Sequence, residues 1–162
     1  MKYLGFYYHI IKKENFYFII NVYTDGSSYG NPGPGGIGII IKSYNLYKEF
    51  TYKFRHTTNN RMELYAIIYA IKIINKLFYY SSNIYSDSKY IINTINYNYK
   101  KNKNYDLWLK LFNLKINRIN FIWIKGHNNN YYNEKCNILA RNVIKNKKKK
   151  NKIDKFYESN IK

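Results

Sequence analysis

The sequence is poor in acidic residues, with 9 Asp and Glu against 28 Lys and Arg, and it contains a single cysteine. The lone Cys136 excludes an internal disulfide and fits a reducing compartment. No apolar run approaches the roughly 18 residues that a membrane span needs. Charged residues interrupt the aromatic stretch 1–21, which lacks the small-residue cleavage site of a signal peptide. We therefore predict a soluble, cytoplasmic protein that makes no membrane contact.

The composition predicts one folded domain with an excess of positive charge. A chain of 162 residues that is 46% apolar and 20% aromatic is long enough for one core and is not wholly disordered. The net charge of +19 indicates a polyanionic partner such as nucleic acid. However, 24 Lys against 4 Arg, together with abundant Asn, Ile and Tyr, also fits a bias toward A/T-rich codons. Charge alone leaves both explanations open.

The order of apolar and polar segments predicts an α/β fold. Period-two and β-branched runs predict strands, whereas longer apolar runs predict helices. We expect three antiparallel strands at 16–24, 36–42 and 47–54, followed by a buried helix at 61–78 and a fourth strand at 81–86. Two helices at 88–96 and 106–114 then flank a basic connector, and a fifth strand at 118–124 and a last helix at 132–146 complete the order. This order predicts a five-stranded mixed sheet flanked by helices. It divides the chain into an N-terminal extension of uncertain order (1–14), one domain (15–146) and a disordered Lys-rich tail (147–162).

Three of the nine acidic residues fall at comparable places in this order. Asp25 follows the first strand, Glu63 lies in the first turn of the central helix, and Asp87 follows the fourth strand. Taken one at a time they have ordinary explanations. Asp25 would form a turn dipeptide with Gly26, Glu63 would form a capping box with Asn60, and Asp87 would be a helix N-cap. If they converge at one edge of the sheet, the carboxylates repel one another unless cations lie between them. Mg²⁺ or Mn²⁺ suits such oxygen ligands, and two such ions can drive displacement at a phosphodiester.

Five sequence motifs then indicate a family. They are YTDGSSYGNPGPGG (23–36), TTNNRMEL (57–64), YSDSKY (85–90), DLW (106–108) and WIKGHNNNYYNEKCNILAR (123–141). In this order, over about residues 20–145, the sequence resembles ribonuclease H, type 1. The resemblance implies a ribonuclease H-like three-layer fold. It also implies a monomeric endonuclease that hydrolyses the RNA strand of RNA–DNA hybrids with two Mg²⁺ ions, Mn²⁺ being a possible substitute, and leaves 3′-hydroxyl and 5′-phosphate ends.

The resemblance also assigns roles to residues at the matching positions. It implies that Asp25 bridges both metals while Glu63 and Asp87 hold the ion nearer the leaving group. It implies that His127 assists proton transfer or product release, although a loop histidine taken alone is more often a bystander. The positions implied to contact nucleic acid are Gly26, Ser27, Asn31 and Asn59 in the minor groove, where 2′-hydroxyls distinguish RNA from DNA, and Thr58 and Asn60 on the DNA backbone.

The sequence departs from the family pattern at the fourth carboxylate. Asn137 follows Cys136 where the family has Asp, so an uncharged amide takes the place of a ligand to the ion that activates the water. We expect that ion to bind more weakly. The basic connector 97–104 is also short for the family. Three functions stay open: an active hybrid ribonuclease, a binding protein of the same fold with weakened chemistry, and a basic structural protein that binds RNA through its tail. The first motif argues against the third, which has no need of its glycines.

Overall fold

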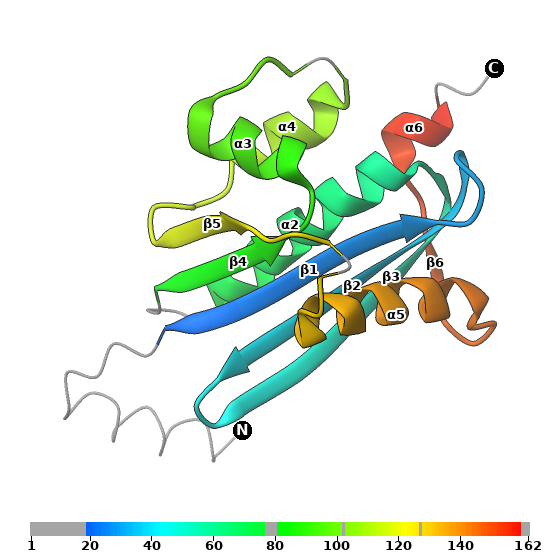
Figure 1. Ribbon diagram of the computed structural model, residues 1–162. Coiled ribbons are helices and arrows are strands. Elements are labelled where there is room, and N and C mark those ends of the chain that lie inside the picture. The colour runs from blue at the N-terminus through cyan, green and yellow to red at the C-terminus, as the bar shows by residue number, and fades with distance from the viewer. Residues whose placement is uncertain (1–18, 77–80, 102, 127, 160–162) are drawn as a thin grey trace.

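A six-stranded mixed sheet forms the centre of the molecule, in the order β5-β4-β1-β2-β3-β6 (Figure 1). The computed structural model describes residues 19–76, 81–101, 103–126 and 128–159. The strands are β1 (Ile20–Ser28), β2 (Gly33–Ser43), β3 (Leu46–Thr57), β4 (Ser82–Ser86), β5 (Ile119–Trp123) and β6 (Asn151–Lys152). The helices are α2 (Asn59–Lys76), α3 (Lys89–Tyr97), α4 (Tyr105–Phe112), α5 (Tyr131–Lys145) and α6 (Lys155–Ser159). The predicted three-layer α/β fold is confirmed.

The chain enters the sheet by two different routes. β1, β2 and β3 follow one another as antiparallel neighbours through short turns. β4 lies parallel to β1, and β5 lies parallel to β4. Parallel neighbours need long connections, which here are α2 and the pair α3–α4. None of the described helices combines the length and the apolar character that crossing a bilayer requires.

Helices cover both faces of the sheet. α2, α3 and α4 lie on one face, and α5 lies on the other (Figure 1). α2 is apolar on most sides and buries Leu64, Ile67, Ile68 and Ile71 in the main core. A helix that is apolar nearly all round is a buried one, as the sequence predicted for this segment.

Two glycines of β2 let α5 approach the other face closely. A Cβ atom at Gly38 would lie 2.3 Å from the carbonyl oxygen of Cys136, and one at Gly36 would lie 2.1 Å from that of Ala140. A larger residue at either position would push the helix off the sheet, because such distances are far inside van der Waals contact. The Cys136 thiol adds a hydrogen bond of 3.2 Å to the carbonyl of Tyr23 in β1. α5 is therefore fixed close to the strand that carries Asp25.

The C-terminal segment differs from the prediction. β6 pairs in parallel with β3, so the sheet has six strands rather than five, and the prediction of a disordered tail is wrong for residues 147–159. The physical reason is Asp154, which is fully buried and hydrogen-bonded to Arg61 of α2. In the sequence Asp154 follows a run of lysines that is typical of a disordered tail, so the residue itself gives no sign of its buried contact. The predicted extension 1–14 and the last three residues, 160–162, lie outside the described residues.

Candidate active site

A pocket of about 300 Å³ opens where β1, α2 and α5 meet the segments that follow β4 and β5. Its lining residues are Asp25, Gly26, Ser27, Asn59, Glu63, Asp87, Gly126 and Asn137. The three carboxylates predicted to converge therefore do so, and the amide at the fourth predicted position joins them.

Asp25 lies inside β1 rather than in a turn after it. It pairs with Gly38 of β2, and the strand continues through Ser28. The alternative of a turn dipeptide with Gly26 is therefore wrong. The side chain of Asp25 is only 4% exposed, and its Oδ1 atom accepts a hydrogen bond of 2.7 Å from the amide of Gly26.

Gly26 brings the first turn of α2 against β1. A Cβ atom there would lie 2.2 Å from the carbonyl carbon of Met62 and 2.3 Å from the amide nitrogen of Glu63. Only glycine allows this approach, which sets Glu63 next to Asp25. The Oε2 atom of Glu63 accepts a hydrogen bond of 2.7 Å from the Ser88 hydroxyl, and its Oε1 atom accepts one of 3.3 Å from Asn59 Nδ2. Since α2 begins at Asn59, the predicted capping box with Asn60 is replaced by these contacts.

Asp87 follows β4 directly, and its carboxylate turns toward α5. The N-cap of α3 is Ser88 rather than Asp87, so the alternative of an N-cap aspartate is wrong. The Oδ2 atom of Asp87 accepts a hydrogen bond of 3.1 Å from Asn133 Nδ2. Gly126 closes the same side, because a Cβ atom there would lie 2.9 Å from that oxygen.

The site carries negative charge that no described cation neutralises. The Oδ2 atom of Asp25 is buried and has no hydrogen-bond partner among the described residues. Burial, followed by repulsion from Asp87, raises the pKa of Asp25 to about 7, although the Asn137 amide and the Gly26 N–H pull it down. Burial also raises the pKa of Glu63, against the lowering effect of the Ser88 hydroxyl. Both shifts follow first from burial and then from the nearby carboxylate of Asp87.

These residues fit a divalent cation that has few protein ligands. Within the described part of the chain, no three His, Cys, Asp or Glu side chains form a ready-made set around one ion. Mg²⁺ is commonly held by one or two carboxylates, with waters and substrate phosphate oxygens completing the octahedron. The unpartnered oxygen of Asp25, with Asp87, Glu63 and the Asn137 amide around the pocket, matches that kind of site.

The residues predicted to contact nucleic acid gather beside the carboxylates. Asn59 links the turn after β1 to the start of α2. Its backbone N–H donates a hydrogen bond of 3.0 Å to Asn31 Oδ1, and its side-chain Oδ1 accepts one of 3.1 Å from the Ser28 N–H. Gly26 and Ser27 line the pocket. The other predicted contacts are Thr58 and Asn60, which flank Asn59 at the start of α2. His127 lies outside the described residues, so its predicted role stays a prediction.

Three site residues escaped the sequence analysis: Ser88, Gly126 and Asn133. Ser88 and Gly126 directly adjoin the predicted site residues Asp87 and His127. Asn133 precedes Asn137 by four residues on α5, which is the spacing that places two side chains on one helix face. That spacing was a usable signal, because a helix that presents residue 137 to the pocket also presents residue 133.

Comparisons with known proteins agree with this geometry. A family model described as RNase H matches residues 19–145. The Ribonuclease H of Wigglesworthia glossinidia brevipalpis is 43% identical over 153 residues, which cover 86% of this chain and 94% of that protein. The Ribonuclease HI of Haemophilus ducreyi is 39% identical over 136 residues, or 75% of this chain and 88% of that protein. Among solved structures, LC11-RNase H1 in complex with an RNA/DNA hybrid is similar with a TM-score of 0.68 and 26% identity, over 78% of this chain and 96% of that one.

Proposed function

The chain belongs to the ribonuclease H family, and from this premise we propose that it hydrolyses the RNA strand of RNA–DNA hybrids with two divalent cations. The products would be 3′-hydroxyl and 5′-phosphate ends. The observation that carries the proposal is the pocket shared by Asp25, Glu63 and Asp87, in which a buried Asp25 oxygen has no hydrogen-bond partner within the described part of the chain. A purely structural carboxylate in that position would have both of its oxygens hydrogen-bonded or paired with a cation.

In this proposal the chain supplies positions and charge for the chemistry. When bound, a pair of divalent cations would activate the attacking water and stabilise the leaving oxygen. Asp25, which is held by the pairing of β1 with β2, would help to hold the ions together with Glu63 and Asp87. Ser88 donates a hydrogen bond to Glu63, and Asn133 donates one to Asp87, which fixes the orientation of the two carboxylates. Neither carboxylate then has to reorganise when substrate arrives.

Recognition of the RNA strand would come from the polar groups at the pocket rim. Ser27 and Asn59 line the pocket next to the carboxylates, and Asn31 is hydrogen-bonded to Asn59. Hydroxyl and amide groups in this arrangement can donate to and accept from a 2′-hydroxyl in the minor groove, which DNA lacks. Thr58 and Asn60, beside them, would contact the DNA strand.

The direct test is cleavage of an end-labelled RNA–DNA hybrid by the purified full-length protein. We expect RNA-strand cleavage with Mg²⁺ or Mn²⁺, none with chelator, and none of the matching DNA duplex. Asp25→Asn should abolish cleavage, whereas Glu49→Gln, a control on an exposed carboxylate that pairs with Lys135, should leave it unchanged. Cleavage by Asp25→Asn near the parent rate would contradict the assignment.

A second candidate function is hybrid binding with weakened chemistry. It rests on Asn137, which lines the pocket and lowers the pKa of Asp25 through its amide without adding charge. The two candidates differ in the same assay. Tight hybrid binding without cleavage at any Mg²⁺ or Mn²⁺ concentration would favour the binding protein, and metal-dependent cleavage would favour the enzyme.

A further inference from the structure

The turn between α5 and β6 concentrates positive charge. Lys145, at the end of α5, is followed after Asn146 by four consecutive lysines, 147–150, and all five are exposed. The sequence has no Asp or Glu between Glu134 and Asp154. Asp154 is fully buried against Arg61, so it does not neutralise the turn. We call Lys145 and Lys147–Lys150 the cationic turn.

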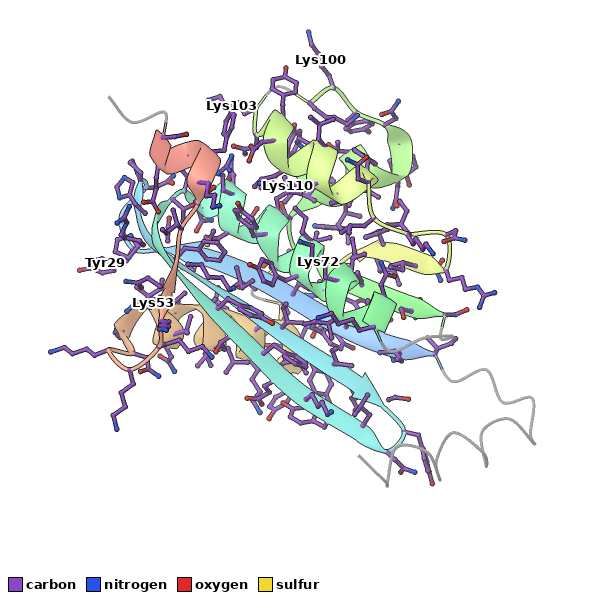
Figure 2. The ribbon with its side chains drawn as sticks, turned by 180° about the vertical axis from the view of Figure 1, so that it is seen from behind. Tyr29, Lys53, Lys72, Lys100, Lys103 and Lys110 are labelled. Atoms are coloured by element: carbon purple, nitrogen blue, oxygen red, sulfur yellow. The ribbon has the colours of Figure 1, made fainter. Side chains whose placement is uncertain are left out.

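The backbone of this turn is held in place. The Oδ1 atom of Asn146 accepts a hydrogen bond of 2.9 Å from the N–H of Lys148, and the carbonyl of Asn146 accepts one of 3.3 Å from the N–H of Lys149. Lys53 of β3 adds a sixth ammonium group, whose Nζ lies 3.2 Å from the same carbonyl. Figure 2 shows Lys53 beside the segment that leads from α5 into β6. Beyond the turn, β6 pairs with β3.

Carboxylates elsewhere in the described chain are already engaged. Glu49 pairs with Lys135, Asp106 pairs with Arg61, and Glu158 pairs with Arg55. Asp25, Glu63 and Asp87 belong to the pocket. Glu134 lies in the first turn of α5, eleven residues before Lys145 and thus roughly 16 Å away along the helix. Six clustered ammonium groups repel one another, and a polyanion would relieve that repulsion.

We propose that the cationic turn is a second binding surface, on which the phosphate backbone of the hybrid rests outside the catalytic pocket. The proposal builds on the proposed function. Lys145 follows Asn137 by eight residues on the same helix, which corresponds to roughly 12 Å along the axis. A duplex that follows α5 from the pocket passes the turn after about four base pairs at 3.4 Å each. A hybrid of twenty base pairs can therefore occupy the pocket and the turn together.

Lysine side chains are suited to binding the phosphate backbone of a nucleic acid rather than its bases. Lysine ammonium groups are strongly hydrated point charges that accept phosphate in many geometries and carry no sequence information. Contacts of this kind release condensed counterions, so each one adds close to one unit to the slope of log affinity against log salt. Because the pocket already tethers the duplex, contacts at the turn add affinity without a second loss of translational freedom.

The test is the salt dependence of hybrid binding, measured in chelator so that no cleavage accompanies it. The variant Lys147→Gln, Lys148→Gln, Lys149→Gln and Lys150→Gln removes four charges while it keeps Asp154 and β6. Truncation of the tail would be less clear, because it also removes Asp154. The matched control neutralises four exposed cations that lie outside the turn, Lys48, Lys76, Lys115 and Arg118. Thermal unfolding should show that both variants remain folded.

We expect the quadruple-turn variant to lower the magnitude of the salt slope for a twenty-base-pair hybrid by about two to four, and the control to lower it by less than one. Binding at 100 mM salt should weaken at least tenfold in the turn variant only. Equal slopes in the two variants, or an unchanged slope in the turn variant, would show that the turn is a solvated surface. The result is independent of the cleavage assay, so failure here and failure of the proposed activity can be told apart.

Discussion

Arg61 and Asp154 form a buried, two-point ion pair between the central helix and the last segment of the chain. Arg61 Nε lies 2.7 Å from Asp154 Oδ2, and the Nη2 atom lies 2.8 Å from Oδ1. Their side chains are 2% and 0% exposed. Thr57 and Tyr65 donate further hydrogen bonds to the same carboxylate, at 2.8 and 3.1 Å. Since Arg61 precedes Glu63 by two residues, the C-terminal segment is joined to the helix turn that enters the pocket.

Removing the acid of this pair should destabilise the protein strongly. Asp154→Ala leaves a buried guanidinium that only Asp106 still balances, so we expect a loss of about 2–4 kcal/mol in the free energy of unfolding. For a chain of this size that corresponds to a fall in Tm of roughly 5–15 °C. Urea unfolding and calorimetry would measure both.

The matched control for this change is Glu49→Gln. Glu49 also binds a cation, Lys135, but the two side chains are 32% and 34% exposed. Exposed pairs contribute at most about 1 kcal/mol, so the control should change the free energy of unfolding little. Equal losses in Asp154→Ala and Glu49→Gln would show that burial of the pair is not what stabilises the tail.

Asp106 gives the stability a pH dependence whose sign is fixed by its environment. Burial pushes the pKa of Asp106 up, but the two hydrogen bonds from Arg61, helped by Lys110, outweigh it and leave the pKa below its ordinary value. A carboxylate with a lowered folded-state pKa stabilises the fold above its unfolded-state pKa, which is about 3.9, and loses that contribution as the pH falls through the folded-state value. Asp154 is the other charged group that contacts Arg61. Its hydrogen bonds to Arg61 are unaffected by a change at Asp106.

The expected result is a difference between the parent and Asp106→Asn that depends on pH. At pH 6 the variant should be less stable by about 1–3 kcal/mol, because it loses a charged, two-point hydrogen bond. Below pH 4 the difference should shrink toward zero as the parent carboxylate takes up its proton. Urea titrations at pH 3, 4, 5 and 6 measure this, and a difference that does not change with pH would contradict it.

Much of the fold could be predicted because its signals are local. The glycine-rich β2, the apolar α2 and the strand–helix alternation after it each have a period or composition that the residues themselves show. The last segment could not be predicted in this way. Its order depends on one contact, Arg61 with Asp154, between residues 93 positions apart, and the surrounding lysines give no local sign of it.

The candidate site shows the same division between local and distant information. The convergence of Asp25, Glu63 and Asp87 could be expected from their places at strand and helix ends. The position of Asp25 within β1 could not, because it depends on the close approach of Gly26 to Met62 and on the continued pairing of β1 with β2. The contact of Ser88 with Glu63 likewise becomes visible only once the elements are packed together, whereas the spacing of Asn133 from Asn137 already indicated that both face the pocket.

Removing the charge of Asp25 should stabilise the protein when no metal is present. The buried carboxylate has two acidic neighbours, and one of its oxygens has no hydrogen-bond partner among the residues that the structure describes. In chelator at pH 8 we expect Asp25→Asn to raise the free energy of unfolding by roughly 1–3 kcal/mol, less than for a fully enclosed ion because the pocket is open to water.

Added metal should make the parent protein more stable to unfolding than Asp25→Asn, the reverse of the order in chelator. Mg²⁺ that binds the folded parent stabilises it in proportion to the logarithm of its concentration above Kd, whereas the variant should gain much less. A Glu49→Gln control should follow the parent in both conditions, since that residue lies outside the pocket. A variant that is less stable than the parent in chelator would show that Asp25 is a structural residue.

The last prediction concerns the amide that stands where a fourth carboxylate is expected. Asn137 lines the pocket and its amide lowers the pKa of Asp25, so the cluster holds three acidic side chains instead of four for two divalent ions. The missing charge should first appear as weak metal affinity, because an uncharged oxygen ligand holds a divalent ion less tightly. We therefore expect cleavage to be low at 1 mM Mg²⁺ and to rise with more Mg²⁺ or with Mn²⁺, which binds a given site more tightly.

Asn137→Asp should lower the metal concentration for half-maximal cleavage by about tenfold, and calorimetric titration of Mn²⁺ should show the same shift without substrate. The control Asn142→Asp adds the same charge to an exposed position of α5, so it reports the general effect of a less basic field. A tighter metal midpoint in Asn137→Asp but not in Asn142→Asp would assign the effect to the pocket. If Asn137→Asp and the parent share one metal midpoint and one maximal rate, the neighbouring dipoles already compensate for the missing carboxylate and this account of Asn137 is wrong.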